Sequence, residues 1–265
     1  MFRYGLIGHP VGHSLSPVIH RRLFAITGLS GTYTLLDISP ALLAPSFRHL
    51  VSDLDGFNIT VPHKTAVLPL LDRLDPSALR YGAVNTVKLE DGALVGYNTD
   101  GIGFLYALSA AGIPLSGRVA ILGCGGAARV FLKEAADAGC ELVNVVRPSA
   151  LPRAESLADG RYPVVTALPS TPVDLLINAT PVGMTPDREG CPVNPDDIRA
   201  TAVFDAVYTP KKTVLLSEAE KRGRIAVGGM SMLVAQAAAA QTIWNGRRFS
   251  PAEIVGIVRE TEGAE

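Results

Sequence analysis

Short apolar runs alternate along most of this chain with segments in which apolar residues recur every three or four positions. The first pattern is typical of buried β-strands, and the second is typical of helices that turn one face toward a core. In the first hundred residues these patterns predict strands at 3–7, 31–37 and 56–60 and helices at 17–27, 41–50 and 63–71. We also expect a hairpin where 83–88 and 94–97 flank Asp91-Gly92, and a helix N-cap at Ser16, before Pro17.

The same alternation resumes at Gly117. It predicts strands at 117–122, 141–146, 174–178, 202–205 and 225–227, a helix that ends near 138, and further helices at 150–158 and 213–222. Strands and helices that alternate in this way are typical of a parallel, doubly wound sheet. Two C-terminal helices, at 232–244 and 251–259, are expected to fold back on the first half of the chain.

The strand that ends at Leu122 runs directly into Gly123-Cys124-Gly125-Gly126-Ala127-Ala128. Gly123 would allow a tight turn, Gly125 would let backbone N–H groups approach a pyrophosphate, and Ala128 would let the next helix pack close to the strand. This pattern indicates a dinucleotide-binding turn; a glycine-rich turn without a ligand is the alternative. We therefore predict an α/β fold with two domains, an N-terminal α/β substrate domain (1–99 and 236–265) and a Rossmann-like doubly wound dinucleotide-binding domain (100–235).

The composition is that of an ordinary globular protein. With 265 residues, 48% of them hydrophobic, and a net charge of −1, the chain can bury a large core, and it has no basic run for nucleic acid. No apolar run is long enough to span a membrane, and the N-terminus is broken too early by glycine and Pro10 to be a signal peptide, so we expect a cytoplasmic protein. The three cysteines are too few and too scattered for a disulfide framework or a zinc site, and we expect no metal.

The loops of the first domain are rich in hydroxyl, amide and charged side chains that lie beside predicted helix starts. Singly, each has a structural interpretation, such as a helix cap or a solvated helix face. Together they form a suitable set for a small polyhydroxylated acid. They are Ser14, Ser16, Asn58, Thr60, Lys64, Asn85, Thr86 and Asp100.

In this order ahead of the glycine turn, these motifs resemble the shikimate dehydrogenase family over nearly the whole chain. The resemblance also includes Asn178-Ala179-Thr180-Pro181-Val182-Gly183-Met184, Asp205-Ala206-Val207-Tyr208-Thr209-Pro210 and the segment from Gly229 to Gln236. It implies a reversible, NADP-dependent reduction of 3-dehydroshikimate to shikimate in aromatic amino-acid biosynthesis. We expect a monomer or homodimer.

The resemblance also implies roles for single residues. Ser14 and Ser16 would hold the substrate carboxylate, Thr60, Asn85, Asp100 and Gln236 its ring oxygens, and Tyr208 would close over it. The cofactor would be bound by Gly123, Gly125, Gly126, Ala127, Arg147, Thr180 and Gly229.

Lys64 and Asp100 are our candidates for proton transfer. Hydride transfer to a ketone builds charge on its oxygen, so an ammonium group can stabilise and protonate that oxygen while a carboxylate holds the amine. For the cofactor, Arg147 at the end of the second nucleotide-binding strand favours NADP, because no acidic residue follows until Glu155. The segment Val146-Arg147-Pro148 departs from the family's Asn-Arg-Thr, and an arginine without a ligand is the alternative there. Two other functions stay open: a quinate/shikimate dehydrogenase that uses NAD, and a non-catalytic nucleotide-sensing paralogue.

Overall fold

The computed structural model describes residues 1–263, which form two compact units. Unit 1 consists of Met1–Gly103 and the residues from Val234 on, and unit 2 consists of Phe104–Leu233. The boundaries fall inside two helices, α4 (Asp100–Ala110) and α8 (Met230–Asn245), so each of these helices contributes residues to both units.

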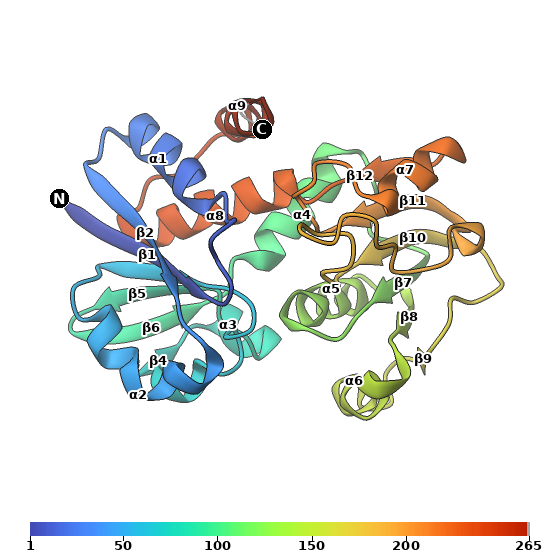
Figure 1. The fold of residues 1–265 in the computed structure, drawn as a ribbon, viewed down its shortest axis with the longest axis horizontal. Helices are drawn as coiled ribbons and strands as arrows, with labels where there is room; N and C mark the ends of the chain where they lie inside the picture. The colour runs from blue at the N-terminus through green and yellow to red at the C-terminus, as the bar shows by residue number, and fades with distance from the viewer. Residues whose placement is uncertain (264–265) are drawn as a thin grey trace. The chain divides into compact units, whose positions relative to one another are not determined.

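Unit 1 is built on a six-stranded mixed sheet in the order β2-β1-β3-β5-β6-β4 (Figure 1). β1 pairs in parallel with β2 and β3, whereas β5 pairs antiparallel with both β3 and β6. The strands are β1 (Phe2–Gly8), β2 (Gly31–Asp37), β3 (Gly56–Ile59), β4 (Arg73–Leu74), β5 (Thr86–Glu90) and β6 (Ala93–Tyr97). The helices are α1 (Ser16–Thr27), α2 (Pro40–Val51), α3 (Pro76–Tyr81), the C-terminal part of α8, and α9 (Pro251–Glu262).

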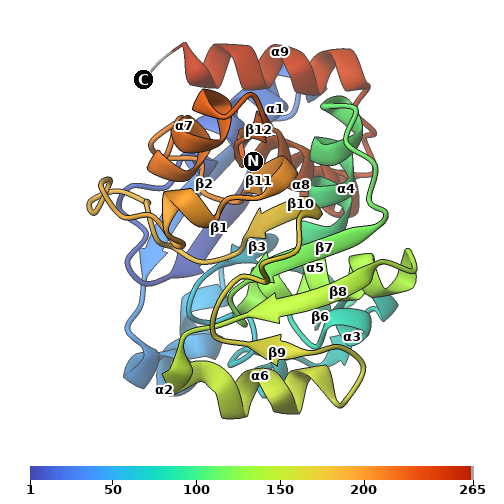
Figure 2. The same ribbon diagram turned by 90° about the vertical axis from the view of Figure 1, so that its right-hand side faces the viewer.

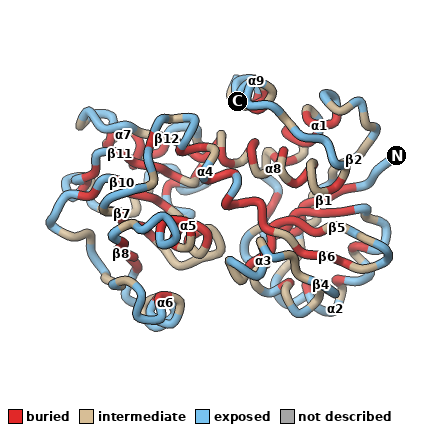
Figure 3. The backbone as a smooth tube through the Cα atoms, turned by 180° about the vertical axis from the view of Figure 1, so that it is seen from behind, coloured by how far each residue is buried: buried red, intermediate tan, exposed pale blue. Residues whose placement is uncertain are grey.

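The alternation of side chains along β1 builds a separate core on each face of this sheet. On one face Tyr4 stacks on Trp244 of α8, with ring centroids 4.4 Å apart, and the Trp244 indole nitrogen donates to the Val87 carbonyl at 2.9 Å. On the other face Ile7 belongs to a buried cluster with Phe47 of α2. The sheet is therefore covered on both sides, as Figure 3 shows by the buried stretches along its central strands.

Two local predictions in unit 1 are wrong. Residues 63–71 form turns and a short 3₁₀-helix (Leu68–Leu70) in place of a helix, because Pro69 has no N–H to donate and the Lys64 carbonyl accepts from Val84 N at 2.8 Å. Ser16 is the first residue of α1; Leu15 occupies the N-cap position, and no side-chain cap hydrogen bond forms.

Unit 2 is built on a six-stranded sheet in the order β12-β11-β10-β7-β8-β9, with every pair parallel (Figure 2). The strands are β7 (Arg118–Leu122), β8 (Glu141–Val145), β9 (Val164–Val165), β10 (Val173–Asn178), β11 (Ala200–Asp205) and β12 (Ile225–Val227), and the helices are α5 (Gly126–Asp137), α6 (Leu151–Ala158) and α7 (Val214–Lys221). This strand order confirms the predicted doubly wound fold.

The sheet of unit 2 also has two apolar faces. On one, Phe104, Phe131 and Phe204 from α4, α5 and β11 form an aromatic cluster, with Phe131 and Phe204 edge to face at 5.9 Å. On the other, Leu215 and Ala219 of α7 pack on strand residues from β7, β8, β10 and β11. Loops follow the carboxyl ends of the central strands, which is where ligands bind in such sheets.

Candidate functional site

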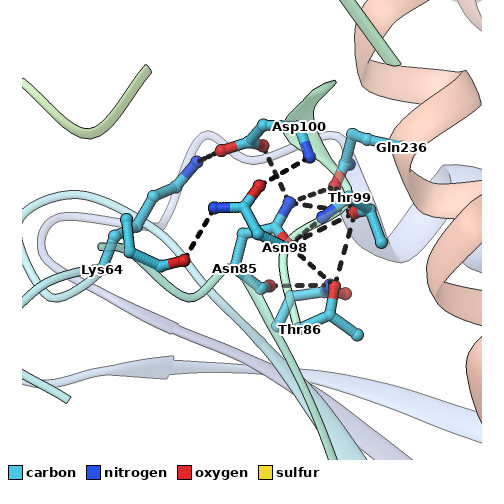
Figure 4. Close-up of polar contacts among 9 residues, drawn as sticks. Lys64, Asn85, Thr86, Asn98, Thr99, Asp100 and Gln236 are labelled. Carbon is cyan, nitrogen blue, oxygen red and sulfur yellow. Dashed lines mark hydrogen bonds and ion pairs between the residues drawn. The ribbon is translucent and has the colours of Figure 1, made fainter. Parts of the chain in front are cut away.

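Lys64 and Asp100 form a close ion pair in unit 1. Lys64 Nζ lies 2.6 Å from Asp100 Oδ2, and the two side chains are only 15% and 5% exposed. Lys64 lies in the turns that follow β3, and Asp100 begins α4, where the helix dipole favours a carboxylate. The structure therefore brings together the two residues for which the sequence predicts proton transfer (Figure 4).

Asn85 holds the second oxygen of this carboxylate. Its Nδ2 donates to Asp100 Oδ1 at 2.7 Å, to Thr99 Oγ1 at 3.0 Å and to Gln236 Oε1 at 3.3 Å. Gln236 comes from α8, far along the chain, so the site is assembled from the β5–β6 hairpin, the start of α4 and a distant helix. Both oxygens of Asp100 therefore have a hydrogen-bond donor, as buried polar atoms require.

Backbone groups fix the orientation of the Asn85 amide. The Thr99 N–H can only donate, and it donates to Asn85 Oδ1 at 2.8 Å, so Asn85 Nδ2 must face Asp100. Thr86 Oγ1 also donates to Asn85 Oδ1, and Asn98 Oδ1 accepts from the Asp100 N–H at 2.9 Å (Figure 4). The polar side chains around the ion pair are thus held by hydrogen bonds within the protein itself.

The two serines of the first loop lie together. Ser14 Oγ is 3.1 Å from Ser16 Oγ and accepts from the Ser16 N–H at 3.2 Å. Ser14 is half-buried and Ser16 is buried at the start of α1. Thr60 follows β3 directly, is half-buried, and its N–H donates to the Ile7 carbonyl at 2.9 Å. These three hydroxyl groups and the pair Lys64–Asp100 all belong to unit 1.

The glycine turn of unit 2 has the geometry that a phosphate group requires. Gly123 has φ +103°, in the region that favours glycine, and a Cβ there would lie 2.9 Å from Thr180 Cγ2. Gly125 is the N-cap of α5, and no atom lies within 4 Å of the position of an added Cβ. Gly126 and Ala127 then form the first turn of a 12-residue helix without a side-chain cap, so its backbone N–H groups and its dipole fit a pyrophosphate.

The other predicted cofactor residues lie in the loops of the same unit. Arg147 is exposed two residues after the end of β8, where it is the N-cap of a 3₁₀ turn (Pro148–Ala150). Thr180 follows β10, and both its N–H and its hydroxyl donate to Asn178 Oδ1, at 3.0 and 2.7 Å. Gly229 precedes α8, and a Cβ there would lie 2.3 Å from the Ala206 carbonyl oxygen.

A buried carboxylate joins the loops after β10 and β11. Asp205 is fully buried and accepts from Asn178 Nδ2, Val207 N and Thr213 Oγ1 at 2.9, 3.0 and 2.7 Å. Burial raises the pKa of Asp205, and the three hydrogen bonds oppose that shift. Tyr208 lies in the loop that Asp205 holds, and its side chain is half-buried.

Comparison with known proteins agrees with this geometry. The profile described as shikimate dehydrogenase substrate binding domain matches residues 6–87. A relative named shikimate dehydrogenase (NADP(+)), from Moorella thermoacetica, is 43% identical over 274 residues, which cover 98% of this chain and 93% of the relative. The chain belongs to the shikimate dehydrogenase family.

Solved structures of shikimate dehydrogenases share the whole fold. Shikimate 5-dehydrogenase from Thermus thermophilus, in complex with NADP(H) and shikimate, is 36% identical with a TM-score of 0.88, covering 98% of this chain and 100% of that one. A chorismate mutase/shikimate 5-dehydrogenase fusion protein from Clostridium acetobutylicum is 32% identical with a TM-score of 0.91, covering 100% and 98%. The predicted family and fold class are therefore confirmed.

In this member of the family, sequence analysis missed the residues that orient the predicted site. The sequence predicts Thr99 only as a cap of the following helix and gives Asn98 no role in the site. In the structure the Thr99 N–H donates to Asn85 Oδ1, and Asn98 Oδ1 accepts from the Asp100 N–H. The Asn98-x-Asp100 spacing was an available signal, since asparagine often accepts from the backbone two residues on. No group of three or more potential metal ligands is found among residues 1–263.

No helix in the described part of the chain is both long and apolar enough to cross a membrane.

Proposed function

We propose that this chain catalyses the reversible, NADP-dependent reduction of 3-dehydroshikimate to shikimate. The observation that carries the proposal is the pair Lys64–Asp100, held at 2.6 Å with a second donor, Asn85, on the free carboxylate oxygen. A catalyst of this reaction needs a proton donor whose position does not depend on solvent, and this arrangement supplies one.

When bound, NADPH supplies the hydride. In the proposed mechanism Lys64 Nζ donates a proton to the oxygen of the substrate's carbonyl group as negative charge develops on it. In the reverse direction Lys64 Nζ takes the proton back from the hydroxyl group. Asp100 Oδ2 keeps the ammonium aimed at that oxygen and balances its charge in a site that excludes most water. Asn85 prevents Asp100 from rotating away, because it binds the opposite carboxylate oxygen.

Substrate binding is assigned to side chains around this pair. Ser14 and Ser16 would receive the carboxylate, because their hydroxyl groups lie together at the start of a helix whose dipole favours an anion. Thr60, Asn85, Asp100 and Gln236 would bind the ring oxygens, and Tyr208 would close over the substrate. The cofactor would lie on Gly123, Gly125, Gly126 and Ala127, with Thr180 and Gly229 beside it and Arg147 at the 2′-phosphate.

An assay of the purified protein with shikimate or quinate, each with NADP or NAD, tests this proposal. We expect the highest kcat/KM with shikimate and NADP. Equal or greater turnover of quinate with NAD would indicate the alternative quinate/shikimate dehydrogenase. If the protein bound a cofactor but turned over neither shikimate nor quinate with NADP or NAD, it would be a non-catalytic nucleotide-sensing protein.

We also propose a cytoplasmic monomer or homodimer without a nucleic-acid partner. The three cysteines, Cys124, Cys140 and Cys191, are all free thiols, which suits a reducing compartment. The near-neutral charge offers no electrostatic footprint for nucleic acid. Sedimentation of the purified protein gives the oligomeric state, and cell fractionation gives the location.

A further inference from the structure

The serine loop, which we define as residues 9–15, has its first turn anchored on the neighbouring strand. It leaves the end of β1 and enters α1 at Ser16. Of its residues, Val11 is buried, whereas Gly12 and His13 are exposed. A loop with so few buried residues has little packing of its own to fix the hydroxyl groups at its end.

Asp37, the last residue of β2, binds this loop at two points. Its Oδ1 lies 2.6 Å from His9 Nδ1, and its Oδ2 accepts from the Val11 N–H at 3.1 Å. A carboxylate can only accept, so His9 Nδ1 carries the proton in this contact. These bonds lower the pKa of Asp37, with His9 the larger cause and Val11 the next, so the carboxylate is ionised at neutral pH.

The contact continues from Val11 to the first serine. The Val11 carbonyl accepts from the Ser14 N–H at 3.0 Å, and Ser14 Oγ then accepts from the Ser16 N–H at 3.2 Å. Val11 therefore stands between Asp37 on its amide side and Ser14 on its carbonyl side. Holding the Val11 backbone in place therefore holds the turn that carries Ser14.

We propose that Asp37 is a positioning residue for substrate binding, which holds the serine loop so that Ser14 and Ser16 meet the substrate carboxylate. The inference rests on the proposed function, since that is what assigns the carboxylate to these serines. Asp37 touches no reacting atom in this scheme. The substrate carboxylate is also remote from the substrate carbon that exchanges hydride. Replacing Asp37 should therefore weaken substrate binding and leave the rate of the chemical step unchanged.

The position of Asp37 allows this role to be separated from a role in stability. Its side chain is 46% exposed at a strand end, so truncation leaves no cavity in the core. Asp72 provides a matched control in the same unit: its side chain is 36% exposed, and it likewise accepts from a backbone N–H, that of Leu94, and from a basic side chain, Arg48. Asp72 has no contact with the serine loop among the hydrogen bonds of residues 1–263.

The test compares Asp37→Ala, Asp37→Asn and Asp72→Ala in the full-length enzyme. We expect Asp37→Ala to raise KM for shikimate, and its calorimetric Kd, by roughly 10-fold, with kcat within about 2-fold of the unmodified enzyme. Asp37→Asn should restore most of the affinity, because its amide oxygen still accepts from the Val11 N–H. Asp72→Ala should leave both constants unchanged.

A neutral substrate gives a second readout. With the methyl ester of shikimate, which lacks the charged group, Asp37→Ala should change KM by no more than about 2-fold, since the loop then has no carboxylate to hold. An unchanged KM for shikimate, or an equal loss with acid and ester, would overturn the inference.

Ser14→Ala and Ser16→Ala separate this outcome from failure of the proposed function. If these serine variants bind shikimate as the unmodified enzyme does, the assignment of the carboxylate is wrong, and the proposed substrate site fails with it. If they weaken shikimate binding while Asp37→Ala does not, the substrate site stands and the role of Asp37 is rejected.

Discussion

Asn85 Nδ2 and Lys64 Nζ bind opposite oxygens of the same carboxylate, that of Asp100, at 2.7 and 2.6 Å. The carboxylate is thus held on both sides, and neither oxygen can turn away from its partner without breaking a short hydrogen bond.

Replacing Lys64 by alanine should lower kcat for shikimate oxidation by about 100-fold or more, the range typical of a lost general acid–base group. Binding of NADP to the free enzyme, measured by calorimetry, should be nearly unchanged, because Lys64 belongs to the substrate motifs. Lys88→Ala is a suitable control, since Lys88 lies in the same unit and pairs with Glu90. Near-normal turnover of Lys64→Ala would remove Lys64 from the mechanism.

Replacing Asp100 by asparagine should reduce kcat by about 10- to 100-fold, less than the loss of the amine itself. The amide keeps the volume of the carboxylate but places an N–H group against either Lys64 or Asn85, which are both donors. Stopped-flow kinetics with saturating substrate and cofactor measure the effect. Turnover equal to that of the unmodified enzyme would show that Lys64 needs no partner.

Arg147→Ala should raise KM for NADP by roughly 10- to 150-fold and leave that for NAD nearly unchanged, because only NADP carries the 2′-phosphate. Arg199→Ala controls for loss of an exposed positive charge, since Arg199 precedes β11 and so lies at the opposite end of the strands. If Arg147→Ala raised KM equally for both cofactors, Arg147 would only stabilise the loop after β8 and would not bind the 2′-phosphate. A preference of the unmodified enzyme for NAD would refute the cofactor assignment.

His20 should make the protein less stable in acid. Its burial lowers the pKa to about 3 in the folded state, against an ordinary value of 6.5, so between these values the unfolded chain binds more protons than the folded one. The free energy of unfolding should therefore fall as pH falls from 6.5 toward 3, by up to about 1.4 kcal/mol per pH unit from this group.

Urea unfolding followed by circular dichroism at pH 7 and pH 4.5 measures this effect. His20→Phe keeps an aromatic ring beside Tyr33, on which His20 stacks at 4.1 Å, and should flatten the difference between the two pH values. His49→Gln, at an exposed histidine of α2, should not. An unaltered pH dependence in His20→Phe would show that other groups cause the acid loss.

Elements with a clear period could be predicted from the sequence, and β2 (Gly31–Asp37) was predicted at both ends. The hairpin around Asp91-Gly92 was also predicted, and its register, with Thr86 opposite Tyr97, is what sets Asn85 beside the residues that lead to Asp100. The helix expected at 63–71 fails because Pro69 has no N–H to donate and because the hydrogen bond from Val84 N to the Lys64 carbonyl competes with a helical one. The spacing of apolar residues along the chain does not reveal such a competing hydrogen bond.

The residues of the candidate site could be predicted from sequence periodicity only in part. Lys64 and Asp100 are 36 residues apart, and Gln236 is 151 residues from Asn85, so their proximity depends on tertiary packing. The resemblance to a family supplied these residues as a set. The Asn85 amide turns its nitrogen to Asp100 because its oxygen accepts from the Thr99 N–H. The position of that backbone N–H cannot be predicted from a sequence motif.

Trp244 is the chain's single tryptophan, and it is buried in unit 1 against Tyr4 and the Val87 carbonyl. Its emission therefore reports the surroundings of one unit. A denaturation curve recorded by tryptophan fluorescence should follow the loss of the sheet that contains β1, whereas far-ultraviolet circular dichroism averages over both units. If the two units unfold at different denaturant concentrations, the two optical curves will separate, and their separation will measure how far the unit with the glycine turn depends on the other for its stability.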